Sequence, residues 1–252
     1  MVALSAALGI VVAASLILAA LSEDVVTRDG LAVRDRANLR FFTVHRTPDL
    51  VSVARAFTAA GAVPFLIVVA VVAGGLLWWR GARLAVAAAP ALSLMVAGTA
   101  VAIAKQLVGR ARPPVALHLV AESDASFPSG HAADSTAVYL TLGLVVAIVV
   151  FRRPVARALT VIGAGLVALA VGSSRLVLGV HWPTDVLAGW SLGVAAAITV
   201  TTAVLLVVRP GPIEPAEGSG QAGRAWLALR RASALRRPGP ARRLTSPTLD
   251  PR

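Results

Sequence analysis

Cysteine is absent from the 252 residues, and acidic, aromatic and lysine residues are scarce. Without cysteine the chain forms neither a disulfide nor a thiolate metal site, so cysteine usage says nothing about the redox compartment. Charged residues make up 14% of the chain, whereas hydrophobic residues make up 57% and the mean hydropathy is +0.79. These values exclude an ordinary water-soluble domain and indicate a membrane protein.

Long runs of Ala, Val and Leu reach the roughly 20 residues that cross a hydrocarbon core as a helix. We expect an all-α, polytopic membrane bundle with six transmembrane helices at residues 2–21, 61–79, 84–104, 132–151, 155–172 and 186–208. The first run could instead be a cleaved signal peptide, but it lacks a basic n-region and is long for an h-region. We predict one membrane domain over residues 1–208, followed by a tail over residues 209–252.

Basic residues outnumber acids by 24 to 12, and their positions predict the topology. The linkers 80–83 and 152–157 contain arginine and no acid, which places them in the cytoplasm by the positive-inside tendency. Both termini are then cytoplasmic. Six arginines in the first long loop, residues 22–60, oppose this orientation, although five acids share that loop. The part of the loop after Thr47 is predicted to form an amphipathic helix at the membrane interface.

The net charge of +12 raises the question of a nucleic-acid partner, but no nucleic-acid-binding module is recognisable. The tail is rich in Pro, Gly and Arg and too polar to fold alone. Its segment 224–243 interleaves hydrophobic residues with arginines, which favours contact with anionic lipid. A disordered solubilising tail is an equally good interpretation. The oligomeric state is not indicated by any sequence pattern.

Ionisable groups gather near the ends of the third to sixth predicted spans. Such a group costs roughly 2.5–3.5 kcal/mol at membrane depth, so its presence there invites a functional explanation. Lys105 ends the third span, His131 opens the fourth, Arg175 ends the fifth, and His181 and Asp185 open the sixth. The connection between spans 3 and 4 and the connection between spans 5 and 6 are separated by two membrane crossings. All five residues therefore lie on one side of the membrane. A single site at the ends of spans 3 to 6 can draw on them all.

Three cations in this set suit the binding of a phosphoryl group, namely Lys105, Arg112 and Arg175. If the helix continues past Gly109, Lys105 and Arg112 share one helix face, two turns apart. An alternative interpretation is a set of interfacial anchors whose charged ends reach the lipid headgroups.

Proline and serine precede the fourth span, in the segment from Phe127 to His131. Ser129 is placed to cap the helix, and backbone N–H groups at such a start bind anions. Gly130 allows the backbone to approach a phosphate oxygen closely. Taken alone, the segment is equally consistent with a capped helix that carries an incidental histidine.

The sixth span begins near His181 and Asp185, with Pro183 suited to the first helical turn. A separation of four residues brings Asp185 back towards His181, where the carboxylate can orient the imidazole. The hydrogen bond to one ring nitrogen then fixes the tautomer of the ring, and the other nitrogen is free to attack phosphorus. As an isolated pair, these residues more often form a structural helix cap.

The combination resembles the three signatures of the type 2 phosphatidic acid phosphatase superfamily in order and spacing. The matching residues are Lys105 with Arg112 and Pro113, the run Pro128, Ser129, Gly130 and His131, and Ser174 and Arg175 with His181 and Asp185. The signature residues show no departure from the pattern, and the resemblance covers roughly residues 84–208 most closely. The chance agreement of three spaced motifs in one order is small.

The resemblance implies a role for each matching residue. His181 is the expected nucleophile, which forms a phosphohistidine oriented by Asp185, and His131 is the expected acid for the leaving oxygen. The expected phosphate-binding groups are Lys105, Arg112, Arg175, Ser129 and the Gly130 backbone. No metal or cofactor is implied. His118, Glu122 and Asp124 lie in a loop that could contact a headgroup or leaving group, but we interpret them as ordinary loop residues. Arg110 could add a phosphate contact, but we interpret it as a solvated loop charge, and Asp134 as a local helix-terminus or hydrogen-bonding group.

The expected activity is hydrolysis of a lipid phosphate or diphosphate, such as phosphatidic acid, phosphatidylglycerophosphate or a polyprenyl diphosphate. A phosphotransferase that uses the same histidine is the main alternative, and a non-catalytic scaffold or anion carrier is another. Vanadium-dependent haloperoxidases have a similar anion site but are soluble, which the spans contradict. The Ala, Val and Arg bias is typical of high-GC bacteria, so we expect a bacterial plasma membrane with the site on its extracytoplasmic side.

Overall fold

The computed structural model describes residues 2–208, and all regular structure in this range is helical. The helices are α1 (Val2–Thr27), η1 (Ala32–Arg34), α2 (Asp35–Val44), α3 (Pro48–Ala60), α4 (Val63–Trp79), α5 (Leu84–Val108), η2 (Val115–Leu117), α6 (Gly130–Val149), α7 (Pro154–Val177) and α8 (Pro183–Val208). The predicted tail at 209–252 lies outside the described residues, so its disorder and lipid contact stay predictions.

Five of these helices, α1, α5, α6, α7 and α8, are long and apolar enough to cross a membrane. A sixth crossing exists if α3 and α4 form one broken span, because the pair passes the same test with a bend of 57° between its parts. The predicted all-α membrane bundle is confirmed, and the predicted second span at 61–79 corresponds to α4. The broken pair has the geometry of either a broken span or a re-entrant segment.

Several span boundaries differ from the sequence-based expectation. The first helix continues beyond residue 21 to Thr27, and the fifth predicted span continues beyond residue 172 to Val177. Helix α5 ends at Val108, because Gly109 has φ of +58°, a left-handed conformation that glycine adopts without a Cβ penalty. The idea of Lys105 and Arg112 on one continuous helix face is therefore wrong, since Arg112 lies in the following loop.

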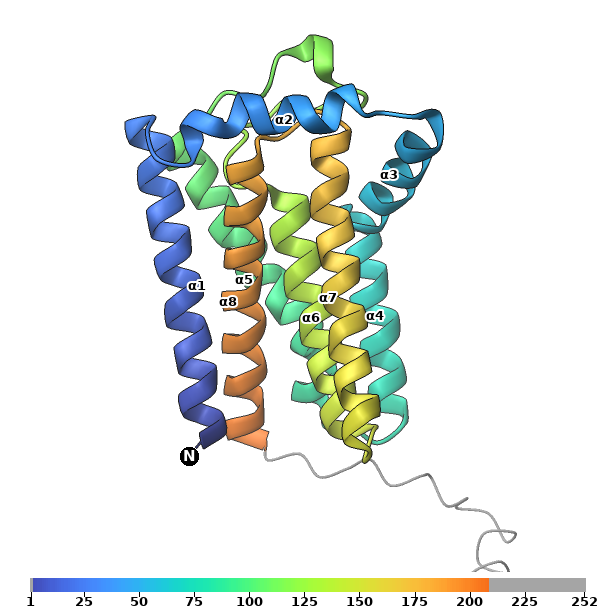
Figure 1. Cartoon of the computed structure of the whole chain (residues 1–252). Helices are drawn as coiled ribbons and strands as arrows, with labels where there is room; N and C mark the ends of the chain where they lie inside the picture. The colour runs from blue at the N-terminus through green and yellow to red at the C-terminus, as the bar shows by residue number, and fades with distance from the viewer. Residues whose placement is uncertain (1, 209–252) are drawn as a thin grey trace, which may run out of the picture. The chain divides into compact units, whose positions relative to one another are not determined.

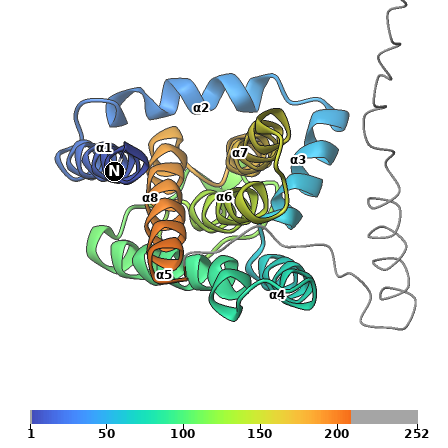
Figure 2. The same cartoon turned by 90° about the horizontal axis from the view of Figure 1, so that it is seen from below.

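Helix α6 lies at the centre of the bundle and contacts α4, α5, α7 and α8 (Figures 1 and 2). Helix α1 packs against α8 at one side of the molecule. Helix α2 runs across one end of the bundle, roughly perpendicular to the long helices, and the loop that contains η2 covers the same end (Figure 1). The predicted helix after Thr47 is present as α3, and the Thr47 side chain accepts a hydrogen bond from the Leu50 N–H at 3.2 Å.

Close packing of α8 on α6 sets the positions of their first turns. Gly189 and Gly193 face α6, and a Cβ on Gly189 would lie 2.6 Å from the Ser129 carbonyl oxygen. Small residues of this kind allow two membrane helices to approach closely. The first turn of α8 consequently touches the start of α6, where the Ser129 N–H donates to the Asp185 carbonyl oxygen at 3.0 Å.

Candidate active site

His181 lies in the short connection between α7 and α8 and is 1% exposed. Its Nδ1 is 3.4 Å from Asp185 Oδ2, and its Nε2 is 3.1 Å from Arg112 Nη1. A guanidinium can only donate, so Nε2 must accept, and the ring proton therefore belongs on Nδ1 facing the carboxylate. This arrangement leaves the Nε2 lone pair directed towards the cationic side of the site.

Asp185 is completely buried in the first turn of α8. Its Oδ2 accepts from the Ser126 hydroxyl at 2.5 Å and from the Trp182 N–H at 2.8 Å. Its Oδ1 accepts from Arg110 Nη1 at 2.5 Å. The carboxylate is thus held in one orientation from several sides, and it can in turn hold the His181 ring.

We expect His181 to stay neutral down to acidic pH. Burial lowers the pKa of His181 from 6.5 to about 4, although Asp185 opposes the shift. NMR titration of histidine-labelled protein should show a neutral His181 ring from about pH 8 to about pH 5, with the His181→Asn variant identifying its signal. A titration midpoint near that of free histidine would contradict the burial argument.

The same shift has a consequence for stability. Because the folded pKa of about 4 lies below the unfolded value of 6.5, the unfolded chain binds more protons between these two values. The contribution of His181 to the free energy of unfolding is therefore lost as the pH falls through this window.

Three predicted phosphate-binding cations converge on two loop carboxylates. Lys105 Nζ donates to Asp124 Oδ2 at 2.6 Å, and Arg112 Nη2 donates to Asp124 Oδ1 at 2.5 Å. Arg112 also pairs with Glu122 at 3.3 Å, and Arg175 Nη2 donates to the other oxygen of Glu122. Carboxylate oxygens are the protein groups that most resemble phosphate oxygens in charge and hydrogen bonding. The prediction that Glu122 and Asp124 are ordinary loop residues is therefore wrong.

Asp124 is ionised at all physiological pH values. Burial alone would raise the pKa of its carboxyl, but the hydrogen bonds and charges of Lys105 and Arg112 outweigh burial and lower it to about 2. The carboxylate therefore remains a competitor for these two cations throughout the neutral and mildly acidic range.

The start of α6 carries the remaining predicted residues. Ser129 is the N-cap residue, but its side chain makes no capping hydrogen bond, so that part of the prediction is wrong. Its buried Oγ has no partner among the described residues, and the same holds for Nε of the buried Arg175. Gly130 begins the helix beside Ser129. His131 follows, and its ring lies within electrostatic range of His181 and Arg175.

Unpaired buried donors are costly unless a ligand or water completes them. The Ser129 hydroxyl and the Arg175 guanidinium are both donors, and both belong to the predicted phosphate-binding set. An anionic ligand with several oxygens is the chemical complement of this arrangement. Among residues 2–208, no three His, Asp or Glu side chains are grouped as the protein ligands of a metal ion.

Arg110 and Asp35 belong to the site although the sequence did not indicate them. Arg110 Nη2 is 2.6 Å from Asp35 Oδ2, while Arg110 Nη1 bonds both Asp185 and the Thr184 hydroxyl. Asp35, at the start of α2 and 2% exposed, also accepts from the Thr184 N–H at 3.0 Å. The expectation of Arg110 as a solvated loop charge is therefore wrong. The pair is 75 residues apart, and no local pattern connects the two positions.

Comparisons with known proteins give a family and several relatives. The PAP2 superfamily matches residues 86–209 of the chain. Phosphatidylglycerophosphatase B of Bacillus subtilis (strain 168) is 35% identical over 163 residues, which cover 63% of this chain and 77% of that protein. Decaprenylphosphoryl-5-phosphoribose phosphatase of Mycobacterium tuberculosis (strain H37Rv) is 35% identical over 108 residues, which cover 42% of this chain and 54% of that protein.

Solved structures show the same fold. The crystal structure of a transmembrane PAP2 type phosphatidylglycerolphosphate phosphatase from Bacillus subtilis superimposes with a TM-score of 0.71 and 28% identity, covering 79% of this chain and 98% of that chain. LpxE of Aquifex aeolicus shares the fold with a TM-score of 0.52 at 22% identity, covering 67% of this chain and 94% of that chain. The resemblance suggested by the three signatures is confirmed. The chain is an integral membrane protein that belongs to the PAP2 superfamily.

Proposed function

We propose that the protein is a lipid phosphatase that hydrolyses a terminal phosphomonoester or diphosphate through a phosphohistidine on His181, without a metal. The observation that supports this proposal most is the convergence of Lys105, Arg112 and Arg175 on carboxylate oxygens beside His181 Nε2. Three cations and a neutral imidazole are the groups needed to bind a phosphoryl group and to attack it.

In the first half-reaction, the Nε2 lone pair of His181 forms a P–N bond while the P–O bond to the lipid leaving group breaks. His131 donates a proton to the leaving oxygen. Asp185 stabilises the positive charge that the His181 ring acquires, and the three cations hold the equatorial oxygens. In the second half-reaction, water attacks phosphorus, His131 takes the water proton, and the P–N bond breaks to release inorganic phosphate.

Substrate binding must displace Glu122 and Asp124 from the cations. We expect the Glu122→Gln, Asp124→Asn double variant to bind inorganic phosphate more tightly, with an inhibition constant lower by roughly three- to tenfold. Each competing ion pair in a partly exposed site contributes on the order of 1 kcal/mol or less. Inhibition of activity by inorganic phosphate measures the effect.

Asp49→Asn is the matched control, because Asp49 is an exposed acid in the first turn of α3. Its inhibition constant should not change. Weaker phosphate inhibition in the double variant would mean that the two acids order the site for phosphate and do not compete with it.

The lipid that carries the phosphate is proposed from the relatives. Two of them are named as phosphatases of phosphatidylglycerophosphate and of a decaprenyl-linked sugar phosphate. Phosphatidic acid, phosphatidylglycerophosphate and a polyprenyl diphosphate are therefore the substrates to compare. We place the reaction on the extracytoplasmic side, because the arginine linkers predicted to be cytoplasmic lie at the opposite end of the bundle (Figure 1).

The test is phosphate release by detergent-purified protein from these three lipids, with EDTA present. Release in EDTA from at least one lipid supports a metal-independent phosphatase and identifies the substrate class. Loss of activity in EDTA that added metal restores would overturn metal independence. Transfer of phosphate to an added lipid acceptor, without free phosphate, would instead establish a phosphotransferase.

A further inference from the structure

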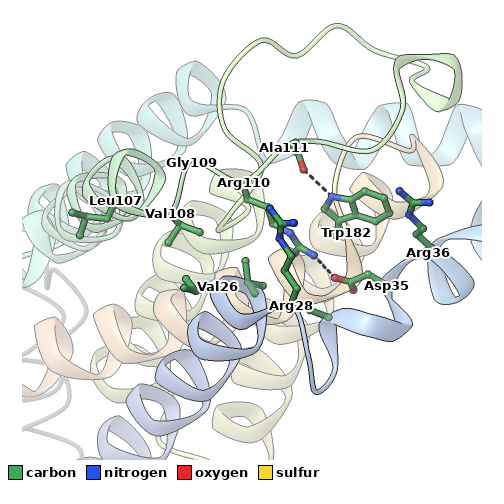
Figure 3. Close-up of a pocket in the computed structure, with 12 residues that line it drawn as sticks. Val26, Arg28, Asp35, Arg36, Leu107, Val108, Gly109, Arg110, Ala111 and Trp182 are labelled. Atoms are coloured by element: carbon green, nitrogen blue, oxygen red, sulfur yellow. Dashed lines mark hydrogen bonds and ion pairs between the residues drawn. The ribbon is translucent and has the colours of Figure 1, made fainter.

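A second cavity of about 640 Å³ lies beside the active site, between the end of α1, the start of α2 and the end of α5 (Figure 3). Trp182 and the segment that follows Gly109 belong to its lining, and Trp182 Nε1 donates to the Ala111 carbonyl oxygen at 2.9 Å. Neither histidine of the proposed mechanism lines this cavity. The cavity adjoins the active site through Arg110 and Asp35, but it does not contain the proposed nucleophile or acid.

The charge that lines the cavity is positive and only partly compensated. Three arginines, Arg28, Arg36 and Arg110, share the lining with a single acid, Asp35. Asp35 is already paired with Arg110 at 2.6 Å. Arg28 and Arg36 form no ion pair with any residue in the described range 2–208. Figure 3 shows the Arg28 side chain extending towards Arg110, so the cavity presents guanidinium groups without a matching anion.

Aliphatic side chains at the ends of two long helices form another part of the lining, Val25 and Val26 from α1 and Leu107 and Val108 from α5. Val26 at the end of α1 is 65% exposed, and Leu107 at the end of α5 is 79% exposed. Both helices are apolar enough to cross the bilayer. Guanidinium groups therefore lie next to exposed aliphatic side chains at the end of the bundle. This order of polarity matches a phospholipid, whose phosphate lies at the interface and whose acyl chains enter the hydrocarbon.

We propose that this cavity binds the headgroup of an anionic phospholipid that is not a substrate, with its acyl chains along α1 and α5. A phosphodiester headgroup offers two anionic oxygens for bidentate contacts with arginine. It has no terminal phosphoryl group, so it does not compete for the nucleophile. A zwitterionic headgroup is disfavoured, because its cationic end would meet the same arginines.

The test titrates phosphatidylglycerol into the full chain in detergent and counts bound lipids by native mass spectrometry, with phosphatidylcholine in parallel. We expect the Arg28→Gln, Arg36→Gln double variant to bind phosphatidylglycerol roughly 10- to 30-fold more weakly. The matched control is Arg34→Gln with Arg40→Gln, two exposed arginines of the same region that do not line the cavity. The control should stay within about twofold of the unaltered protein.

Several outcomes would overturn the proposal. If both double variants bound phosphatidylglycerol equally weakly, the lipid would be held by general surface charge. If the Arg28→Gln, Arg36→Gln variant bound it as tightly as the unaltered protein, the lipid would bind elsewhere. Displacement of the lipid by inorganic phosphate at similar concentration would indicate a simple anion site. Phosphate release by the Arg28→Gln, Arg36→Gln variant should stay near that of the unaltered protein, which keeps this test separate from that of the catalytic proposal and shows that the variant is folded.

Discussion

Replacement of His181 by asparagine is expected to lower kcat/KM for lipid phosphate by at least about 10⁴-fold. The Nε2 atom is the unprotonated ring nitrogen next to the cations, and the variant has no nucleophile in its place. The asparagine amide keeps a donor towards Asp185, so the fold and phosphate binding should persist. Two measurements follow the half-reactions separately. One is the release of free phosphate, and the other is the capture of a labelled phosphoenzyme by rapid denaturation without acid.

His118→Asn is the matched control for this variant. His118 lies in the loop over the site, and its Nε2 is 2.9 Å from the Pro113 carbonyl oxygen, while within residues 2–208 no hydrogen bond joins it to His181. Its replacement should change kcat/KM by no more than a few-fold. If His181→Asn kept one hundredth or more of the activity, or if label still appeared on the protein, another residue would be the nucleophile.

The parts of this site that the sequence predicted are those with local causes. Long apolar runs determine the spans. The number of crossings between two span ends then determines whether the residues beside them share one side of the membrane. The structure accordingly brings Lys105, Arg175 and His181 to the same end of the bundle as the loop that contains Arg112. The spacing of His181 and Asp185 likewise follows from the first turn of a helix.

The parts that the sequence did not predict depend on tertiary packing. Asp35 reaches Arg110 and Thr184 only because α2 crosses the end of the bundle, and no pattern along the chain encodes that crossing. The loop acids Glu122 and Asp124 look like ordinary solvated charges until the fold places cations against them. The Ser129 hydroxyl lies at a cap position without the cap bond, in a turn against which α8 packs closely.

Replacement of Arg110 by glutamine is expected to lower kcat by about 10²-fold with KM within about threefold. Asp35 and Asp185 are almost completely buried, and Arg110 donates to both at 2.6 and 2.5 Å. Without this cation the two buried carboxylates lose the donor that they share, which favours uptake of a proton by Asp185. A protonated Asp185 is a weaker acceptor for the His181 Nδ1–H and no longer stabilises positive charge on the ring, so the ring is held less firmly in its tautomer and orientation. Steady-state kinetics measure the effect.

The Arg110→Gln substitution should also reduce the free energy of unfolding by about 3 kcal/mol, because an uncompensated buried charge remains. Thermal unfolding in detergent measures this change. Arg55→Gln is the control, since Arg55 is an exposed arginine that donates to the Leu119 carbonyl oxygen, at 3.2 Å.

A second substitution separates a positioning role for Arg110 from a purely structural one. In the Asp35→Asn, Arg110→Gln variant Asp185 is the remaining carboxylate of this pair, and it still accepts from Ser126 and from the Trp182 N–H. We therefore expect kcat to recover at least tenfold relative to Arg110→Gln alone, because Asp185 becomes ionised again. If kcat stayed low while stability recovered, Arg110 would act by its own donor contacts to Asp185. If Arg110→Gln instead raised KM at constant kcat, Arg110 would contact the substrate and would not position the carboxylate.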